Sequence, residues 1–208
     1  MSLSLFAVFL AAALLGSTPF GVVVTRLLGH ADPRAGGSRN IGATNVIRTS
    51  GWLPGLLTLA GDALKGTLAI AWMPPLLATG AADPALAQSA AALGAVFGHM
   101  FSPFTGFKGG KGVATGLGVF AYWMPGPTAW AALAFAAAVG LTRYVSLGSI
   151  LAACALPLAG GLMGYPEPSV FTAALIASFI IRRHADNIRR LLRGEESRLG
   201  RKRPEGSA

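Results

Sequence analysis

The sequence predicts an all-α protein that crosses a membrane several times. Of its 208 residues, 53% are hydrophobic and only 12% are charged, whereas a soluble domain carries roughly 25% charged residues. The mean hydropathy is +0.57, and apolar stretches long enough to cross a hydrocarbon layer of about 30 Å recur along the chain. These observations exclude an ordinary soluble domain. The single cysteine, Cys154, lies in an apolar stretch and offers neither a disulfide framework nor a cysteine-based metal site.

Seven spans account for the apolar stretches, and with a basic cytoplasmic tail at 183–208 they form one domain over 1–208. We expect the spans at 3–25, 53–77, 85–101, 112–124, 127–141, 146–163 and 168–182. The first is too long for a signal peptide and is not followed by a small-residue cleavage site, so we expect it to be retained. The fourth reaches only about 20 Å as a helix. Residues 112–141 therefore either cross twice or form a re-entrant hairpin that is broken at 125–127.

The Lys and Arg residues alternate between the connections. They occur in the connections at 26–48 and 108–111, at Arg143 and from Arg182 onward, whereas the connections near Asp83, 125–127 and Glu167 have none. This positive-inside pattern places the basic connections and the C-terminus in the cytoplasm and the N-terminus outside. The net charge of +9 is spread over these connections and not gathered on one soluble face, so no nucleic-acid partner is expected.

Three glycine-rich polar segments fall on the predicted cytoplasmic side. They are GSRNIGATNVIRTSG at 37–51, GHMFSPFTGFKGGKGVATG at 98–116 and HADNIRRLLRGEESRLG at 184–200. A protein that carries a solute across is expected to hold polar groups near the bilayer centre, whereas here they gather on one surface. The pattern favours a surface site. A transporter of a phosphorylated solute and a non-catalytic membrane scaffold are the alternatives.

The second segment suits a phosphate group. Its Lys108–Gly112 stretch, KGGKG, runs directly into an apolar span. Glycines allow positive φ and let backbone N–H groups converge, and the start of the next helix adds partial positive charge. It is not a Walker A loop, because the spacing GxxxxGK[ST] is absent. A glycine-rich hinge with two orienting lysines is the simpler alternative.

The first segment places polar side chains at helical spacing. Asn40, Thr44 and Arg48 follow one another every four residues, so they share one face if a helix begins near Gly42. Ser38 would then precede that helix, where it could cap the helix or contact an anion. A helix cap in a solvated polar loop is the alternative.

Other polar residues lie at the ends of the spans or inside them. His184 and Asn187 are three residues apart on a helix that leaves the last span, and the arginines around them could equally bind anionic lipid. Asp62 and Lys65 can pair inside the second span, where an unpaired charge costs about 2.5 to 3.5 kcal/mol. Their role is either structural or to line an inward-facing polar site. The stretch 142–149 offers a cation and two serine hydroxyls at another helix start.

These motifs together resemble one enzyme family. GSRNIGATNVIRTSG, GDALKG, GHMF with FKGGKGVATG, TRYVSLGSI and HADNIRRLLRGEE, in this order and spacing, resemble the bacterial acyl-phosphate:glycerol-3-phosphate acyltransferase family, PlsY, over nearly the whole chain. The resemblance implies a seven-helix enzyme of the bacterial cytoplasmic (inner) membrane whose active site faces the cytoplasm. It implies acyl transfer from acyl phosphate to the 1-hydroxyl of sn-glycerol 3-phosphate, which gives lysophosphatidic acid and phosphate for phospholipid biosynthesis. No cofactor or metal is implied. The implied partners are both substrates, membrane lipids and the enzyme that supplies acyl phosphate.

The resemblance also carries roles to residues of this chain. It implies that five residues are needed for catalysis: Ser38, Arg48, Lys111, His184 and Asn187. The candidate substrate-binding residues are Asn40, Gly42, Thr44, Asn45, Lys108, Gly109, Gly110, Gly112, Arg143, Ser146 and Ser149. The candidate structural polar residues are Asp62, Lys65, His99, Glu195 and Glu196. The chain departs from the family pattern at Arg39, where glycine is usual, and at Ala185, where arginine usually follows the histidine.

The implied reaction does not need a Ser-His-Asp triad, and none can be assembled from the three histidines His30, His99 and His184. An acyl phosphate is a mixed anhydride with an activated carbonyl, so the protein mainly has to align two mutually repelling phosphoryl groups and neutralise them. The cations available for this are Arg48, Lys108, Lys111, Arg143 and His184. The proton of the alcohol passes either to His184 or to a substrate phosphate. The 28 glycines favour close helix packing beside a groove for the acyl chain.

Overall fold

The computed structural model describes residues 3–78 and 83–200, and all the regular elements within these ranges are helical, which confirms the all-α prediction. The two 3₁₀ helices are η1 (Pro33–Ala35) and η2 (Pro103–Thr105). The α-helices are α1 (Leu3–Gly16), α2 (Phe20–Leu27), α3 (Ala43–Ser50), α4 (Trp52–Leu77), α5 (Pro84–Met100), α6 (Val113–Trp123), α7 (Pro125–Thr142), α8 (Val145–Leu162), α9 (Glu167–Arg183) and α10 (Ala185–Leu192). The last part of the predicted tail, 201–208, lies outside the described residues.

Six of the seven predicted spans coincide with the helices α4 to α9, and their bounds agree within two residues. Among the described residues, three helical segments are long and apolar enough to cross a membrane by length and composition: Leu3–Leu27, Trp52–Leu77 and Val145–Leu162. The stretch 112–141 forms two helices joined at Met124. The second of them, α7, has 18 residues and is about 27 Å long. This length approaches the thickness of the hydrocarbon layer.

The first predicted span is not one continuous helix, because it breaks at Pro19. Proline has no N–H group and interrupts the helical hydrogen-bond ladder. The backbone carbonyl groups at the break find partners elsewhere. Ser102 Oγ donates to the carbonyl of Ser17 at 2.6 Å, and Lys65 Nζ donates to the carbonyl of Thr18 at 2.7 Å. The break is therefore attached to α4 and to the loop that follows α5.

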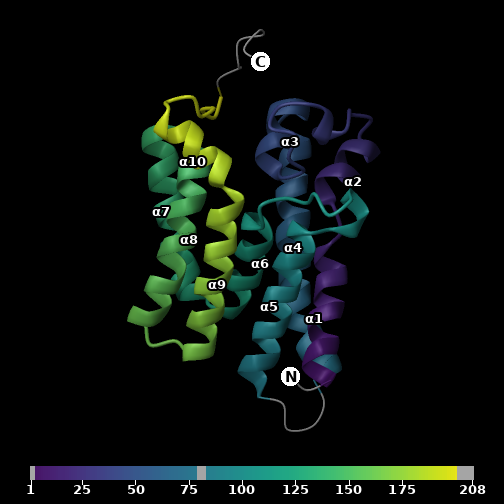
Figure 1. Ribbon diagram of the computed structural model, residues 1–208, viewed down its shortest axis with the longest axis vertical. Coiled ribbons are helices and arrows are strands. Elements are labelled where there is room, and N and C mark those ends of the chain that lie inside the picture. Colours follow the sequence, from purple (N-terminus) through teal and green to yellow (C-terminus); the bar gives the residue numbers. More distant parts are fainter. Residues whose placement is uncertain (1–2, 79–82, 201–208) are drawn as a thin grey trace.

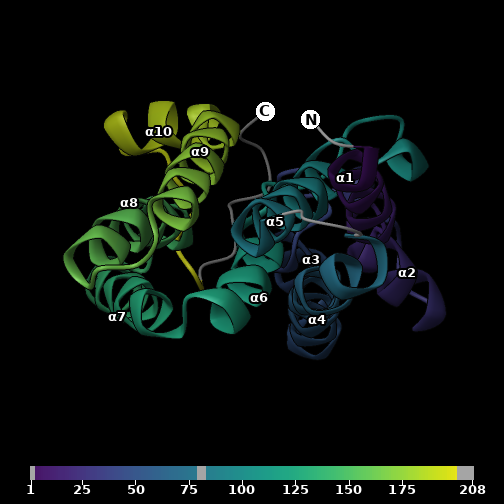
Figure 2. The same cartoon turned by 90° about the horizontal axis from the view of Figure 1, so that it is seen from below.

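The long helices run alternately in opposite directions and form two groups. Seen along the bundle, α7, α8 and α9 lie together, and α1 to α6 form the other group (Figure 2). Contacts of α6 with α7 and of α5 with α9 join the groups. Helices α2, α3 and α10 lie toward one end of the bundle, whereas the beginning of α1 and the α8–α9 turn lie at the opposite end (Figure 1). The basic connections thus gather toward one end, as the charge pattern predicts.

Glycines bring neighbouring helices into backbone contact. A Cβ atom added at Gly98 of α5 would lie 2.0 Å from the carbonyl oxygen of Ala13 in α1, and one at Gly118 of α6 would lie 1.8 Å from that of Ala63 in α4. No larger residue fits at either position without moving a backbone. Close approach of this kind is how helices in membranes gain packing energy, and it gives the site a rigid frame.

Candidate functional site

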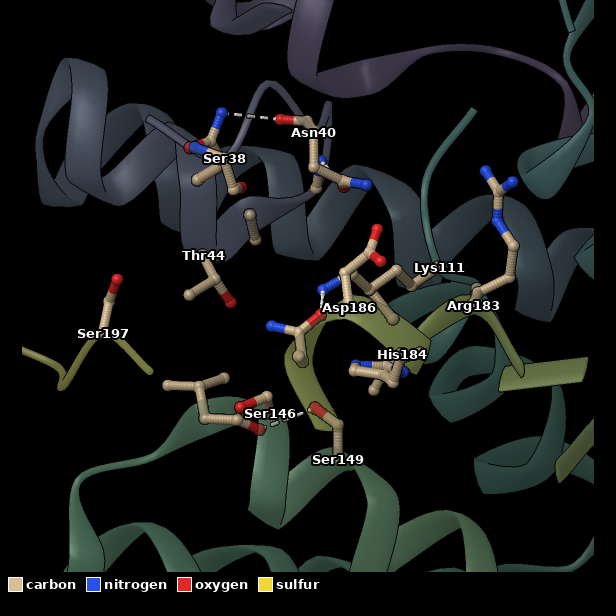
Figure 3. A pocket seen from close by; sticks show the side chains of 18 of the residues that line it. Ser38, Asn40, Thr44, Lys111, Ser146, Ser149, Arg183, His184, Asp186 and Ser197 are labelled. Atoms are coloured by element: carbon tan, nitrogen blue, oxygen red, sulfur yellow. Dashed lines mark hydrogen bonds between the residues drawn. The ribbon is translucent and has the colours of Figure 1, made fainter. Parts of the chain in front are cut away.

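A cleft of about 930 Å³ lies between the two helix groups, at the end of the bundle that carries α3 and α10. It is lined by parts of all three polar segments, which lie far apart in the sequence (Figure 3). Leu59 and Asp62 of α4 and Ser146 and Ser149 of α8 complete much of the wall. The three segments, which the sequence analysis places on one surface, therefore line one pocket.

The cleft is built to hold anions. The first turns of α3, α6, α8 and α10 all line it, and each helix start contributes a partial positive charge of about half a unit. Three carboxylates also line it, of which Asp62 is paired with Lys65 and Glu196 with Arg190. Six basic side chains outnumber these carboxylates: Arg39, Arg48, Lys111, Arg182, Arg183 and Arg190.

One wall of the cleft is a loop wound around the side chain of Asn45. This buried amide donates from Nδ2 to the carbonyl groups of Pro33 and Asn40, both at 2.8 Å. Its Oδ1 accepts the backbone N–H of Ser38 at 2.8 Å. Asn45 thus fixes the loop that carries Ser38, a structural role that the sequence analysis missed.

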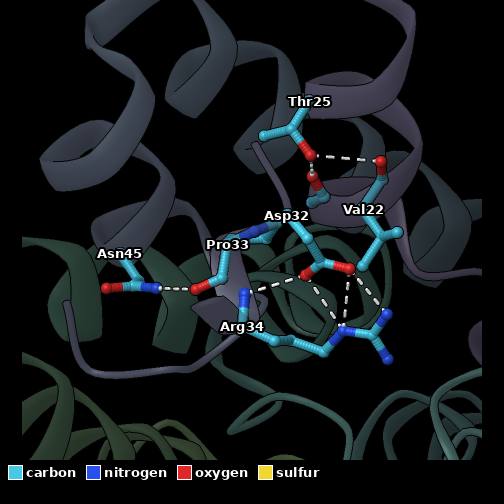
Figure 4. A network of polar contacts seen from close by, with 7 residues as sticks. Val22, Thr25, Asp32, Pro33, Arg34 and Asn45 are labelled. Atoms are coloured by element: carbon cyan, nitrogen blue, oxygen red, sulfur yellow. Dashed lines mark hydrogen bonds and ion pairs between the residues drawn. The ribbon is translucent and has the colours of Figure 1, made fainter. Parts of the chain in front are cut away.

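The same loop is stabilised by a further contact at Asp32 and contains one residue, Arg39, in an unusual backbone conformation. Asp32 accepts the backbone N–H of Arg34 at 2.8 Å and pairs with its guanidinium at 2.6 Å (Figure 4), and the Arg34 hydrogen bond lowers the pKa of Asp32. Arg39 has a φ of 56°, in the left-handed region that favours glycine. Glycine would adopt this backbone conformation more readily than the arginine that the chain has here.

Two expectations for the first segment are wrong. Helix α3 begins only at Ala43, so Asn40 does not share a helical face with Thr44 and Arg48. The Asn40 side chain instead accepts the backbone N–H of Gly42 at 2.9 Å. Ser38 does not cap the helix either, because Gly42 is the N-cap and no side chain caps it. Thr44 and Arg48 do line the cleft.

A chain of hydrogen bonds crosses the cleft. Lys111 Nζ donates to Asn187 Oδ1, and Asn187 Nδ2 donates to Glu196 Oε1 at 2.7 Å. Glu196 also accepts from Ser146 Oγ at 2.9 Å and from Arg190 Nε at 2.7 Å. Burial raises the pKa of Glu196, but these hydrogen bonds outweigh burial and hold it below its ordinary value.

Burial and neighbouring charges shift the pKa values of the two central bases. Burial lowers the pKa of Lys111 to about 8, opposed by Glu196 and reinforced by nearby arginines such as Arg48. Burial and the charge on Lys111 lower the pKa of His184 to about 4. His184 Nδ1 donates to the carbonyl of Ile180 at 2.8 Å, which leaves Nε2 as an acceptor. The expectation that His184 acts as a cation is therefore wrong, and it is a neutral acceptor at pH 7.

The glycine loop does not form the expected cradle of backbone N–H groups. The N–H groups of Gly109 and Gly110 donate to the carbonyls of Met100 and His99, at 3.2 and 3.1 Å, so they close the end of α5. Neither glycine lines the cleft. Gly112 does line it, with a φ of 84° as the N-cap of α6.

Four other predicted residues also lie outside the lining: Lys65, which is buried beneath the cleft, and Lys108, Arg143 and Glu195. Lys108, Arg143 and Glu195 are exposed, and Arg143 ends α7, where its carbonyl accepts the N–H of Leu199 at 2.8 Å. The carboxylate joined to the site is thus Glu196 and not Glu195. The predicted residues that do line the cleft are Ser38, Asn40, Gly42, Thr44, Asn45, Arg48, Asp62, His99, Lys111, Gly112, Ser146, Ser149, His184, Asn187 and Glu196.

A buried polar cluster lies beneath the cleft. Lys65 Nζ is 2.7 Å from Asp62 Oδ1 and 2.9 Å from His99 Nδ1, and its third contact is the carbonyl of Thr18. The ammonium group of Lys65 thus has two hydrogen bonds and one ion pair, and the paired atom, Asp62 Oδ1, has no hydrogen-bond partner among the described residues. Both interpretations of the Asp62–Lys65 pair hold in part, because it ties α4 to the α1–α2 break while Asp62 also reaches the cleft.

Sequence reasoning missed four basic residues of the lining: Arg39, Arg182, Arg183 and Arg190. Arg190 lies three residues after Asn187, on the same face of α10, so helical spacing could have identified it. Nothing local identifies Arg183. Its partners lie more than 70 residues away along the chain.

Known proteins resemble the chain over nearly its whole length. A family model described as glycerol-3-phosphate acyltransferase matches residues 6–194. A glycerol-3-phosphate acyltransferase of Aromatoleum aromaticum is 48% identical over 195 residues, which are 92% of this chain and 94% of the relative. One of Syntrophotalea carbinolica is 46% identical over 200 residues, which are 94% and 98% of the two chains.

Solved structures agree with this similarity. PlsY (YgiH), described as an integral membrane glycerol 3-phosphate acyltransferase, is 39% identical. Its glycerol 3-phosphate form has a TM-score of 0.86 and covers 95% of this chain and 96% of its own. Its lysophosphatidic acid form has a TM-score of 0.84 and covers 96% of each chain.

Proposed function

Since the chain belongs to the glycerol-3-phosphate acyltransferase family, we propose that it transfers an acyl group from acyl phosphate to the 1-hydroxyl of sn-glycerol 3-phosphate. The products are lysophosphatidic acid and phosphate. The site faces the cytoplasm from the bacterial inner membrane, which the chain crosses seven times with its N-terminus outside. The observation that carries this proposal is the convergence of Arg48, Lys111, His184 and Asn187 on one cationic cleft.

The site chemistry supports acyl phosphate as the donor. Its carbonyl is already activated, so direct attack by the acceptor needs no enzyme nucleophile. The hydroxyls of Ser146 and Ser149 donate to Glu196 and to the carbonyl of Val145, so neither is paired with His184 as an activated nucleophile would be. Direct transfer between two bound anions fits this arrangement better than an acyl-enzyme route.

Five side chains of the cleft and the start of one helix have roles in this transfer. Lys111 and the start of α6 hold a phosphate and offset the negative charge that develops on the attacked carbonyl oxygen. Thr44 and Ser149 surround the phosphate of the acyl donor. Asn187 and His184 engage glycerol 3-phosphate, with Nε2 of His184 accepting a hydrogen bond from the attacking hydroxyl.

The bond changes follow from these positions. A bond forms between the 1-oxygen of glycerol and the acyl carbon, and the bond from that carbon to the phosphate oxygen breaks. A pKa of about 4 makes His184 a weak base, whereas a phosphate monoester has a second pKa of about 6. The proton of the alcohol therefore leaves on a substrate phosphate, and His184 orients the hydroxyl.

The test uses purified, detergent-solubilised protein with acyl phosphate and glycerol 3-phosphate, without nucleotide, metal or coenzyme A. We expect lysophosphatidic acid and inorganic phosphate in equal amounts, and almost none from Lys111→Ala. A parallel reaction contains acyl-coenzyme A in place of acyl phosphate. Product from that reaction alone would overturn the donor assignment, and folded protein that is inactive with both donors would overturn the activity.

A further inference from the structure

The position of Lys111 depends on a long loop. Residues 101–112 join α5 to α6 and contain only the short helix η2. Gly109 and Gly110 precede Lys111 directly, so their backbone determines where its side chain starts. Something outside the loop has to fix these two glycines if the ammonium is to sit beside Asn187.

Arg183, the last residue of α9, contacts this backbone. Its Nη2 donates to the carbonyl groups of Gly109 at 2.8 Å, Gly110 at 3.1 Å and Met100 at 3.2 Å. Its Nε donates to Gly110 at 3.2 Å, and its guanidinium carbon lies 5.6 Å from the centre of the Phe101 ring. A planar, rigid fork of donors suits such a set of carbonyls, and a lysine ammonium does not reproduce it.

His99 also contacts the same backbone. A Cβ atom added at Gly110 would lie 2.1 Å from His99 Nε2, so the loop and the imidazole are in direct contact. The imidazole is held in turn by Lys65. The glycine backbone is thus contacted both by a guanidinium from α9 and by a buried ring from α5.

We propose that Arg183 is a positioning residue that fixes the position of the Lys111 side chain relative to His184 and Asn187. Arg183 directly precedes His184 in the chain, so the same turn presents the histidine to the cleft and holds the lysine loop. It also links α9 to the loop across the gap between the two helix groups. Its effect on catalysis rests on the proposed acyl transfer. The charge of Arg183 also helps to lower the pKa of Lys111.

The kinetic test compares Arg183→Gln and Arg183→Lys with a matched control, Arg193→Gln. Arg193 is an exposed residue of the same tail, outside the cleft lining. We expect kcat/KM for glycerol 3-phosphate to fall about 10- to 100-fold in Arg183→Gln and by a smaller factor in Arg183→Lys. The control should stay within about twofold of the wild type, as surface substitutions usually do. Methylguanidine should restore part of the activity of Arg183→Ala.

A readout independent of activity is hydrogen exchange of the loop amides. The N–H groups of Gly109 and Gly110 should exchange at least about tenfold faster in Arg183→Gln, with α1 and α8 unchanged. The proposal is overturned by unchanged loop exchange, by faster exchange throughout the protein, or by unchanged kcat/KM in Arg183→Gln. The two proposals can fail separately. If the wild type shows no acyl transfer but the loop amides of Arg183→Gln exchange faster, the proposed function is overturned, whereas the contact between Arg183 and the loop is supported.

Discussion

The ammonium group of Lys111 should set the alkaline limit of activity. With a pKa of about 8, it is about nine-tenths protonated at pH 7, half protonated at pH 8 and about one-tenth protonated at pH 9. In the proposed transfer, the protonated form carries the charge that offsets the phosphates and the developing oxyanion. Activity is therefore fully present below this pKa and is lost as the pH rises through it. This alkaline limit lies below the ordinary lysine pKa of 10.5 because burial lowers the pKa of Lys111.

The assay measures lysophosphatidic acid formation at a series of pH values and separates kcat/KM from kcat. The first quantity reports the free enzyme and the second reports the enzyme with its substrates bound. Bound phosphates favour the ammonium form, so the alkaline limb of kcat should lie at a higher pH than that of kcat/KM. Each pH unit between the two limbs corresponds to about 1.4 kcal/mol of added interaction between Lys111 and bound phosphate.

Lys111→Arg is the decisive control. A guanidinium stays protonated throughout the accessible pH range, so this variant should retain a reduced activity without the limb near pH 8. Lys111→Ala lacks the cation at every pH and should be slow throughout. The same limb in Lys111→Arg as in the wild type would assign the titration to another group and refute the reasoning.

Three further outcomes follow from the contacts described above. Glu196→Gln removes a charge that raises the pKa of Lys111, so the alkaline limb of kcat/KM should move to lower pH in the same assay. Gly110→Ala places a methyl group 2.1 Å from the imidazole beneath it and should lower kcat/KM at least about tenfold, whereas Gly140→Ala, with nothing within 4 Å, should not. Asp62→Leu leaves a buried ammonium unpaired and should destabilise the protein by about 3 to 5 kcal/mol, seen as earlier thermal unfolding in detergent. A second substitution, of the partner lysine by methionine, should recover most of that loss.

The helix positions could be predicted from the sequence because hydropathy acts locally. Helix α4, for instance, begins directly after Gly51 and ends where its apolar stretch ends, so both limits can be recognised in the sequence. The break between α1 and α2 depends on more than Pro19. It is stable because Ser102 and Lys65 supply partners for the carbonyls of the break, and these residues are distant in sequence.

The membership of the site was more predictable than its electrostatics. Arg48 and Lys111 belong to polar segments that are conspicuous in an apolar chain, and both line the cleft. The charge of His184 could not be predicted, because it depends on burial and on Lys111 beside it. The direction of the Gly109 and Gly110 N–H groups depends on the end of α5, which a glycine pattern does not reveal.

The composition of the cleft suits the two phosphates that the proposed transfer brings together. Two unit charges 4 Å apart repel by about 4 kcal/mol at an effective dielectric constant of 20, and each phosphoryl group carries more than one charge. The helix starts and the arginines supply positive charge that does not titrate near neutral pH. Lys111 differs from them, since its pKa of about 8 makes its charge sensitive to what occupies the site. A bound phosphate favours the ammonium form, so substrate binding itself completes the positive charge needed in the transition state.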